Sequence, residues 1–225
     1  GLATRLGGIP KFLLPDRTGR ALLAAHIDSA KDISLVLVVT RPELYDFVSK
    51  FVSERLERPL EVIAASTATM SETVHQALER APDVQDFVVG LPDTAVSPSI
   101  PYRSLHVALK NSKLSVAAFP TRPDQVGRLG AIRLEGNWCV EARDKDPSTR
   151  WMHHWGALGF RREIFDRWSD PAHPHVGIAF ELALKAGESA AVAHFGAEYF
   201  DLGTVEEVAS YWRSASSSLE SMGRS

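Results

Sequence analysis

Apolar, β-branched runs alternate with helical stripes over the first 91 residues, and this alternation constrains the fold more than any other feature of the chain. Residues 34–40 are almost entirely Leu and Val, as in a strand buried on both faces of a sheet. Residues 42–52 then carry apolar side chains at helical spacing. The order repeats as strand 60–65, helix 71–80 and strand 86–91, which predicts three parallel strands joined by right-handed crossovers.

The pattern changes after residue 110. Strands are predicted at 114–120, 126–134, 138–142, 156–160 and 190–195, with Gly136 and Asn137 forming a tight turn, and helices at 162–168, 176–187 and 205–214. We therefore expect an α/β fold: a three-layer α/β/α sandwich with a mixed, mostly parallel Rossmann-like central sheet and a small antiparallel extension.

The length of 225 residues and the hydrophobic content of 44% suit one domain, which we place at 1–213. Residues 214–225 are small and polar, and we expect a flexible tail there. Because Gly1 opens on a loop-like sequence where a parallel sheet first needs a buried strand, we also expect a strand to precede it.

Charge and cysteine content exclude several classes of protein. The net charge is -3 and no basic block occurs, so a nucleic-acid partner is not expected. No apolar run approaches the roughly 20 residues that span a bilayer, so a membrane is not expected either. The single cysteine, Cys139, cannot form an intramolecular disulfide and is interpreted as a core residue. These features together predict a cytoplasmic protein.

Several polar segments could carry chemistry. Residues 1–11 combine a small-residue turn, able to bring N–H groups to an anion, with the cations Arg5 and Lys11, although an ordinary solvated loop fits equally well. Asp93 follows a buried strand, where ligand sites of α/β sheets gather, but it could also be a plain turn residue. Asp201 precedes Gly203 and Thr204, which could simply cap a helix.

Five segments in order, 1–6, 10–11, 91–93, 144–145 and 200–204, resemble the active site of the sugar-1-phosphate nucleotidyltransferases. These enzymes join a nucleoside triphosphate to a sugar phosphate and release pyrophosphate. The chain departs from the family pattern at Ala3, which replaces a glycine, at Asp146, which is inserted, and in the short gap between Arg5 and Lys11.

The resemblance implies a role for each matching residue. Asp93 and Asp201 would hold Mg²⁺, which usually takes one or two protein carboxylates together with phosphate oxygens. The implied catalytic residues are Arg5, Lys11, Asp93, Lys145 and Asp201. The implied nucleotide contacts are Leu2, Ala3, Thr4, Arg5, Lys11, Thr67, Ser71, Pro92 and Asp93, and the implied sugar-phosphate contacts are Thr94, Lys145, Trp155 and Gly156.

Other interpretations stay open. The chain could be a cytidylyltransferase for a non-sugar phosphate such as choline phosphate, or a non-catalytic nucleotide-binding homologue. A metal-dependent glycosyltransferase is disfavoured because residues 93–95 lack an Asp-x-Asp pair. Zinc on Asp170, His173 and His175 has no support from Cys or helix-spaced His, and we place these residues near the substrate mouth. A nucleoside triphosphate and a sugar 1-phosphate are the expected partners, and a homo-oligomer is not excluded.

Overall fold

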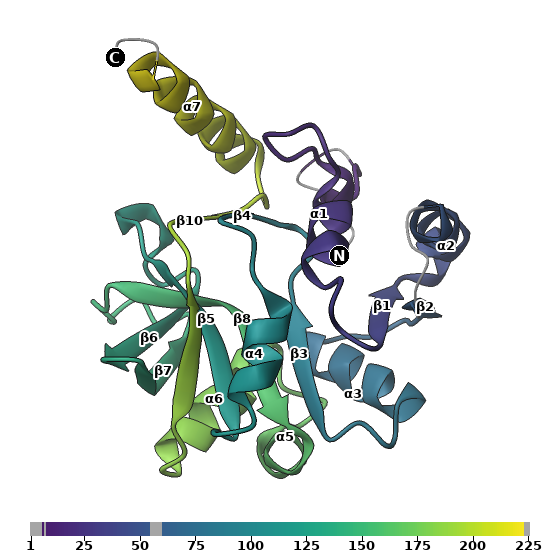
Figure 1. Ribbon diagram of the computed structural model, residues 1–225, viewed down its shortest axis with the longest axis vertical. Helices are drawn as coiled ribbons and strands as arrows, with labels where there is room; N and C mark the ends of the chain where they lie inside the picture. Colours follow the sequence, from purple (N-terminus) through teal and green to yellow (C-terminus); the bar gives the residue numbers. More distant parts are fainter. Residues whose placement is uncertain (1–5, 7, 55–59, 223–225) are drawn as a thin grey trace.

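The computed structural model describes residues 6, 8–54 and 60–222, and side chains only to residue 214 (Figure 1). The alternating elements predicted near the start are present: β1 (Val36–Thr40), η3 (Pro42–Leu44), α2 (Tyr45–Ser53), β2 (Leu60–Ala64), α3 (Met70–Arg80) and β3 (Asp86–Gly90). β1 and β2 form a two-stranded parallel sheet. Neither β1 nor β3 has a second partner strand within the described residues, and the expected strand before Gly1 stays a prediction.

A six-stranded sheet forms the centre of the molecule. It is built from β3 with β5 (Leu114–Pro120), β6 (Gly130–Glu135), β7 (Trp138–Asp144), β8 (His153–Arg161) and β9 (Ala190–Phe195). The strand order is β3-β8-β5-β9-β7-β6, and β6 pairs again with β8, so five of the strands close into a barrel-like ring. The predicted tight turn joins β6 to β7, with Gly136 at a φ of 59° that favours glycine.

The α/β class is confirmed, but the prediction of a mostly parallel sheet is wrong. Among the described strands only β1–β2 and β5–β9 pair in parallel, whereas β8 runs antiparallel to β3, β5 and β6. A strand buried on both faces gives the same apolar run whichever way its neighbours point, so the sequence pattern carries no strand direction. The predicted antiparallel extension is therefore the greater part of the main sheet.

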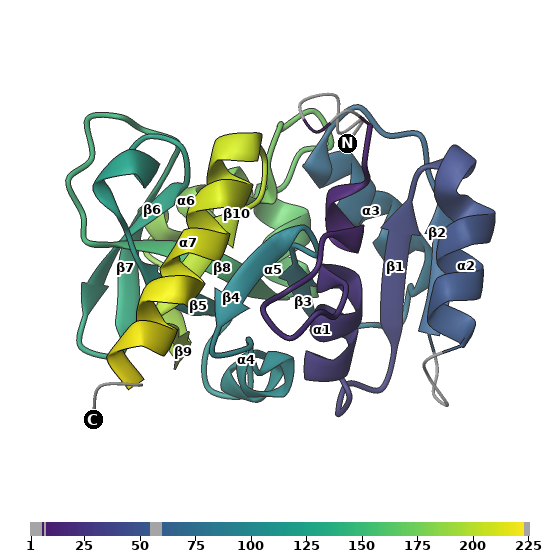
Figure 2. The ribbon, with the colours of Figure 1, turned by 90° about the horizontal axis from the view of Figure 1, so that it is seen from above.

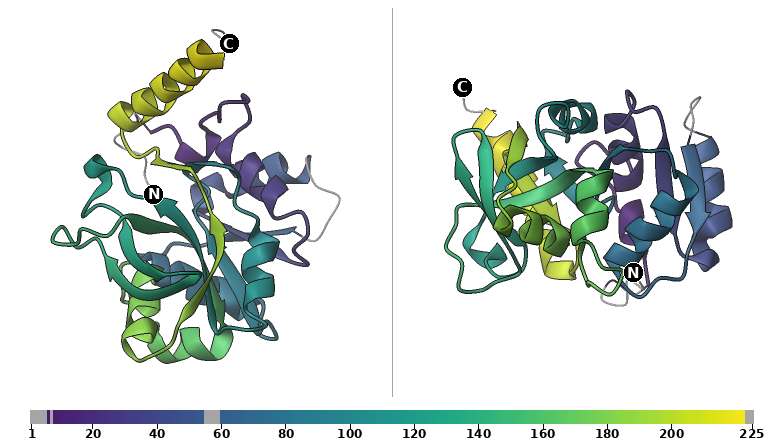
Figure 3. Two further views of the ribbon diagram at one scale, coloured as in Figure 1. Left: turned by 60° about the vertical axis from the view of Figure 1, so that its left-hand side comes forward. Right: turned by 90° about the horizontal axis from the view of Figure 1, so that it is seen from below.

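Helices cover both faces of this sheet (Figures 1 and 3). On one face, Val116 and Ala118 of β5 belong to a core cluster with α3, α5 (Arg162–Trp168) and α6 (Val176–Lys185). On the other face, Ala117 and Phe119 pack with α4 (Tyr102–Ala108). This alternation along one strand is the period of two that a sheet imposes, and it buries β5 completely up to Phe119.

Several elements were not predicted. They are α4 and the elements η2 (Lys11–Leu13), α1 (Leu22–Ser29), β4 (Thr94–Ser97), η4 (Pro123–Gln125) and β10 (Glu198–Asp201). The last helix, α7 (Val205–Met222), follows β10 and points away from the body of the molecule (Figure 1), and the view from above shows it in front of the sheets (Figure 2). It extends beyond the predicted end at residue 214, so the described part of the predicted tail is helical. The domain boundary at residue 213 stays a prediction.

Cys139 is fully buried, which confirms its interpretation as a core residue. Burial raises the pKa of its thiol to about 12. None of the described helices combines the length and the apolar content that a membrane crossing needs. The cytoplasmic location stays a prediction.

We predict that stability falls on acidification because His154 is buried neutral. Burial lowers the pKa of His154 to about 3, whereas the unfolded chain takes up a proton near the ordinary value of 6.5. The unfolded state therefore binds more protons below 6.5, and stability is lost as pH falls through that value. Between pH 7 and about pH 5, the free energy of unfolding measured with urea should fall by about 2 kcal/mol more in the wild-type protein than in His154→Phe, whose side chain cannot titrate. An equal pH effect in both proteins would contradict this assignment.

Candidate active site

The structure brings together three of the predicted catalytic residues. Lys11 Nζ lies 3.5 Å from Asp93 Oδ2 and 3.7 Å from Asp201 Oδ1. Asp93 precedes β4, which pairs antiparallel with β10 so that Thr94 lies opposite Asp201. Two aspartates that are 108 positions apart in the chain thus meet because of one strand pairing that the sequence did not reveal.

The segment after Asp201 is fixed by the start of α7. The N–H of Glu207 donates to Thr204 Oγ1, and Glu207 Oε2 accepts the N–H groups of Gly203 and Thr204. This reciprocal arrangement is a capping box. Arg128 forms an ion pair with Glu207. Thr204 is therefore a helix cap as well as part of the matched segment, as the sequence allowed.

The turn that carries Asp93 is held by a histidine that the sequence analysis missed. His26 Nε2 lies 2.9 Å from the carbonyl oxygen of Thr94, and His26 Nδ1 lies 2.6 Å from the Tyr102 hydroxyl. Burial lowers the pKa of His26, so the neutral ring fits this network best. Thr94 itself is buried and donates its hydroxyl to the Leu91 carbonyl, so its side chain stabilises the turn around Pro92.

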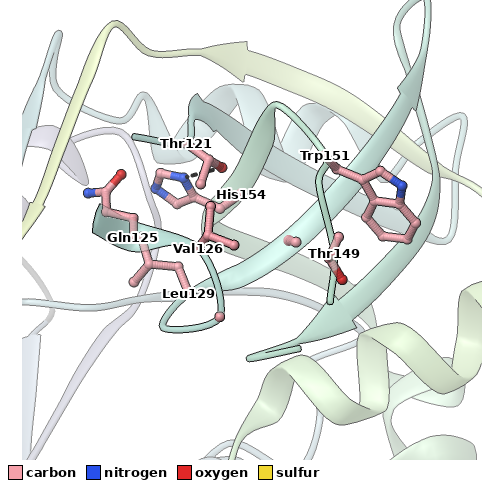
Figure 4. A pocket seen from close by; sticks show the side chains of 9 residues that line it. Thr121, Gln125, Val126, Leu129, Thr149, Trp151 and His154 are labelled. Carbon is pink, nitrogen blue, oxygen red and sulfur yellow. Dashed lines mark hydrogen bonds between the residues drawn. The ribbon is translucent and has the colours of Figure 1, made fainter. Parts of the chain in front are cut away.

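Two side chains fix β10 by donating hydrogen bonds to one of its carbonyl groups. Arg122 Nη1 and Gln125 Nε2 donate to the Tyr199 carbonyl oxygen at 2.8 and 2.9 Å. The Arg122 guanidinium also lies over the Phe200 ring, 4.4 Å from its centroid. Beside this contact Gln125 lines a small hollow with His154, whose Nδ1 lies 3.2 Å from the Thr121 hydroxyl (Figure 4). None of the residues predicted for the site lines that hollow.

The two carboxylates are suited to a divalent cation. Burial raises the pKa of Asp201, and the neighbouring charges of Asp93 and Glu207 raise it further, while Lys11 lowers it. The carboxylate pair therefore has excess negative charge that the single Lys11 ammonium offsets only in part. The side chains of Asp93 and Asp201 are 38% and 41% exposed, so substrate oxygens and water have access to both. Hard oxygen donors in this setting fit Mg²⁺ or a similar ion.

Lys145 does not belong to the cluster of Lys11, Asp93 and Asp201, and it follows the last residue of β7. Its Nζ is 2.7 Å from Nε2 of His175, the residue that precedes α6. Within the described residues no hydrogen bond or ion pair connects Lys145 to Asp93 or Asp201. The predicted catalytic residues therefore divide into a carboxylate cluster with Lys11 and a separate cationic position at Lys145.

Thr67 and Ser71 lie around the start of α3. The Thr67 hydroxyl is 2.6 Å from that of Thr73, and Thr69 caps the helix by accepting the Glu72 N–H. Ser71 is fully buried, and its hydroxyl has no hydrogen-bond partner in the described structure. Their predicted contact with a nucleotide stays a prediction.

Trp155 and Gly156 are buried on β8. Trp155 is 8% exposed and packs in the main core cluster. A Cβ at Gly156 would lie 2.5 Å from the Phe119 ring, so this position needs glycine for close packing. Both residues thus have a packing role, and their contact with a sugar stays a prediction. Leu2, Ala3, Thr4 and Arg5 lie outside the described residues.

Sequence reasoning missed His26, Arg122, Gln125 and Glu207 as contributors to the site, and it placed His175 near the substrate mouth without giving it a role. Only Glu207 had a readable signal, because Thr204 followed three residues later by Glu is the pattern of a capping box. The others act through contacts between segments far apart in the chain, and no local spacing marks such contacts.

Comparison with known proteins identifies the family. A family model described as a MobA-like NTP transferase domain matches residues 1–176. A structure from Bacillus anthracis described as a glucose-1-phosphate thymidylyltransferase aligns with a TM-score of 0.75 and 16% identity, over 94% of this chain and 90% of that one. A UDP-glucose pyrophosphorylase bound to UDP-glucose aligns with a TM-score of 0.75 and 16% identity, over 97% and 96%.

An inositol-1-phosphate CTP transferase from T. maritima also aligns, with a TM-score of 0.69 and 13% identity, over 92% of this chain and 87% of that one. At these identities the structural matches show a shared fold. No relative was found among curated proteins.

We predict that Lys11→Met raises the affinity of the protein for Mn²⁺ or Mg²⁺ when no substrate is present. The Lys11 ammonium lies within 4 Å of both carboxylates and repels a second cation there, so its removal should tighten binding about tenfold. Isothermal titration calorimetry with Mn²⁺ measures this change. The matched control is Lys31→Met at an exposed position, which should leave the affinity unchanged. Weaker binding in Lys11→Met would show that the carboxylates do not form the cation site.

Proposed function

The chain belongs to the MobA-like NTP transferase domain family and is a nucleotidyltransferase, and from that premise we propose that it acts on a sugar 1-phosphate. The products would be a nucleoside diphosphate sugar and pyrophosphate. One observation supports this proposal most strongly: a lysine and two aspartates from distant parts of the chain converge within 4 Å. The names of the aligned thymidylyltransferase and UDP-glucose pyrophosphorylase support the same substrate class.

The proposed reaction is an in-line displacement. A phosphate oxygen of the sugar 1-phosphate attacks the α-phosphorus of the nucleoside triphosphate. The bond from that phosphorus to the bridging oxygen breaks, and pyrophosphate leaves with the electron pair. No protein nucleophile is required, so the protein contributes positioning and charge neutralisation.

Each charged residue then has a defined task. Asp93 and Asp201 would hold Mg²⁺, which when bound neutralises charge on the phosphates. Lys11, beside both carboxylates, would meet the α-phosphate, and Arg5 would hold the phosphates that leave. Lys145 would bind the phosphate of the sugar. The raised pKa of Asp201 implies that the carboxylate pair gains stability from a bound cation.

A cytidylyltransferase for a non-sugar phosphate is the second candidate. The aligned inositol-1-phosphate CTP transferase, whose acceptor is not a sugar, is the observation that favours it. A non-catalytic nucleotide-binding homologue is the remaining alternative. Pyrophosphate release from a matrix of nucleoside triphosphates against sugar 1-phosphates, inositol 1-phosphate and choline phosphate separates the three. Product with sugar 1-phosphates supports our proposal, product only with the other acceptors supports the second candidate, and no product supports the third.

We predict that Asp93→Asn and Asp201→Asn each lower kcat about 10³-fold or more, because each removes a charged oxygen ligand that neutralises the transition state through its cation. Pyrophosphate release with saturating substrates and Mg²⁺ measures the loss. Asp83→Asn, at an exposed position, is the matched control and should keep normal activity. Circular dichroism should show that all three variants fold. Near-normal turnover in either site variant would remove that carboxylate from the mechanism.

A further inference from the structure

The loop at residues 169–175, between α5 and α6, is anchored to the start of α3. The Thr69 hydroxyl donates to the Pro171 carbonyl at 2.5 Å, and the Met70 N–H donates to the Pro174 carbonyl at 3.2 Å. At its start, the Ser169 hydroxyl lies 3.0 Å from His75 Nε2. The loop ends at His175, and α6 begins at the next residue. The contacts with α3 on one side and the start of α6 on the other therefore fix the position of His175.

His175 faces Lys145, a residue with an unusual backbone. Lys145 has a φ of 54° and is the only residue other than glycine with positive φ in the described part of the chain. Such a conformation costs free energy for a residue with a Cβ and persists where the surroundings enforce it. The Asp144 N–H, one residue earlier, donates to Glu181 Oε2 at 2.9 Å, which holds this backbone against α6. The strained backbone aims the Lys145 ammonium at His175.

The contact between the two side chains defines their protonation. A lysine ammonium can only donate, so at 2.7 Å His175 Nε2 must be the acceptor on a neutral ring. Within the described residues, neither Lys145 nor His175 forms a salt bridge with a carboxylate. The ammonium therefore keeps donor capacity that no acidic side chain uses. Two nitrogen groups that can both carry positive charge lie close together, and in the described part of the chain the Asp144 carboxylate is the one acidic group whose charge acts on both. With both nitrogens protonated the site has excess positive charge, which fits an anion.

We propose that His175 and Lys145 jointly bind the phosphate group of the acceptor substrate, a phosphate monoester dianion. His175 releases the hydrogen bond from Lys145, takes up a proton and donates Nε2–H to a phosphate oxygen, while Lys145 donates to another. The identity of that phosphate as the sugar 1-phosphate rests on the proposed function, whereas the anion site itself does not.

Binding at this site is coupled to proton uptake. Burial lowers the pKa of His175, and the Lys145 charge lowers it further, while Asp144 raises it. Beyond these, the charge of Glu181 on α6 acts on Asp144, and Arg143 of β7 forms an ion pair with Glu181 at 3.8 Å. A bound dianion raises the pKa of His175, so the ring is neutral when free and protonated when bound. His175 thus contributes most at low pH, and its contribution to binding falls as pH rises through the interval between the two pKa values.

Steady-state kinetics of His175→Gln, with His173→Gln as the matched control, test the proposal. His173 is in the same loop, and its Nδ1 accepts the Asp170 N–H instead of contacting Lys145. Near pH 6, His175→Gln should raise KM for the acceptor phosphate about 10- to 100-fold, the value of a charge-assisted hydrogen bond, with kcat and the KM for the nucleotide unchanged. Near pH 8.5 the difference should shrink, because the imidazole is then neutral in wild type. An acceptor KM equal to that of His173→Gln at both pH values would overturn the proposal.

A binding measurement separates this inference from the proposed function. Inorganic phosphate is titrated into the wild-type protein and His175→Gln while the histidine ring signals are followed by NMR across pH. Phosphate should raise the pKa of one histidine in wild type, and that signal should be absent from His175→Gln and present in His173→Gln. This result supports the anion site even if no substrate pair gives pyrophosphate. No pKa change in wild type up to a saturating phosphate concentration would overturn the site even if the enzyme is active.

Discussion

The charge cluster of Lys11, Asp93 and Asp201 depends on the packing around it and does not itself hold the fold together. Ion pairs as exposed as these contribute at most about 1 kcal/mol, and burial, together with the neighbouring charge of Asp93, raises the pKa of Asp201, so its charged form is disfavoured there. Apolar contacts offset that cost: Leu14 and Leu22, on either side of the loop after Lys11, pack with Phe200, Leu202 and Tyr211. Arg17 adds an ion pair to Glu198 of β10 at 2.6 Å. The hydrophobic contacts therefore fix the geometry that a cation and phosphates can then use.

The charged side chains discussed above lie in two clusters, one around Lys11 and one around Lys145. Around Lys11 the protein gathers two carboxylates, which suit a cation, whereas around Lys145 it places a second nitrogen group, His175, with Asp144 as the nearby acidic group, a set that we propose suits an anion. Under the proposed function, two anionic substrates that repel each other must meet. A metal ion beside the nucleotide phosphates and separate protein cations beside the acceptor phosphate would reduce that repulsion without using the same residues. The loop at 169–175 lies beside both the predicted nucleotide contacts on α3 and Lys145, and it holds these two regions at a fixed separation.

The sequence predicted local elements well and long-range pairing poorly. Residues 34–40, 86–91 and 190–195 were identified as strands because each is an apolar run bounded by polar residues. Their directions were not predictable, since an apolar run does not indicate which way the neighbouring strands point. β4 and β10 have four residues each, too few for a periodicity, yet their pairing places Asp93 beside Asp201. The aspartates were recognised from resemblance and the position of Asp93, but the contacts of His26 and His175 are tertiary and carry no local signal.

A residue that matches a family motif can support a site by packing as well as by touching a ligand, and Gly156 illustrates this. Its missing Cβ admits the Phe119 ring, which packs 5.4 Å from the Tyr199 ring, and Tyr199 also meets His154 edge to face at 4.7 Å. The Tyr199 carbonyl is the group that Arg122 and Gln125 hold, two residues before Asp201. A side chain at Gly156 would displace Phe119 and, through Tyr199, the strand that presents the carboxylate. The requirement for glycine at this position therefore follows from the packing of Phe119 and Tyr199 beside the strand that ends at Asp201, whether or not a sugar ever contacts β8.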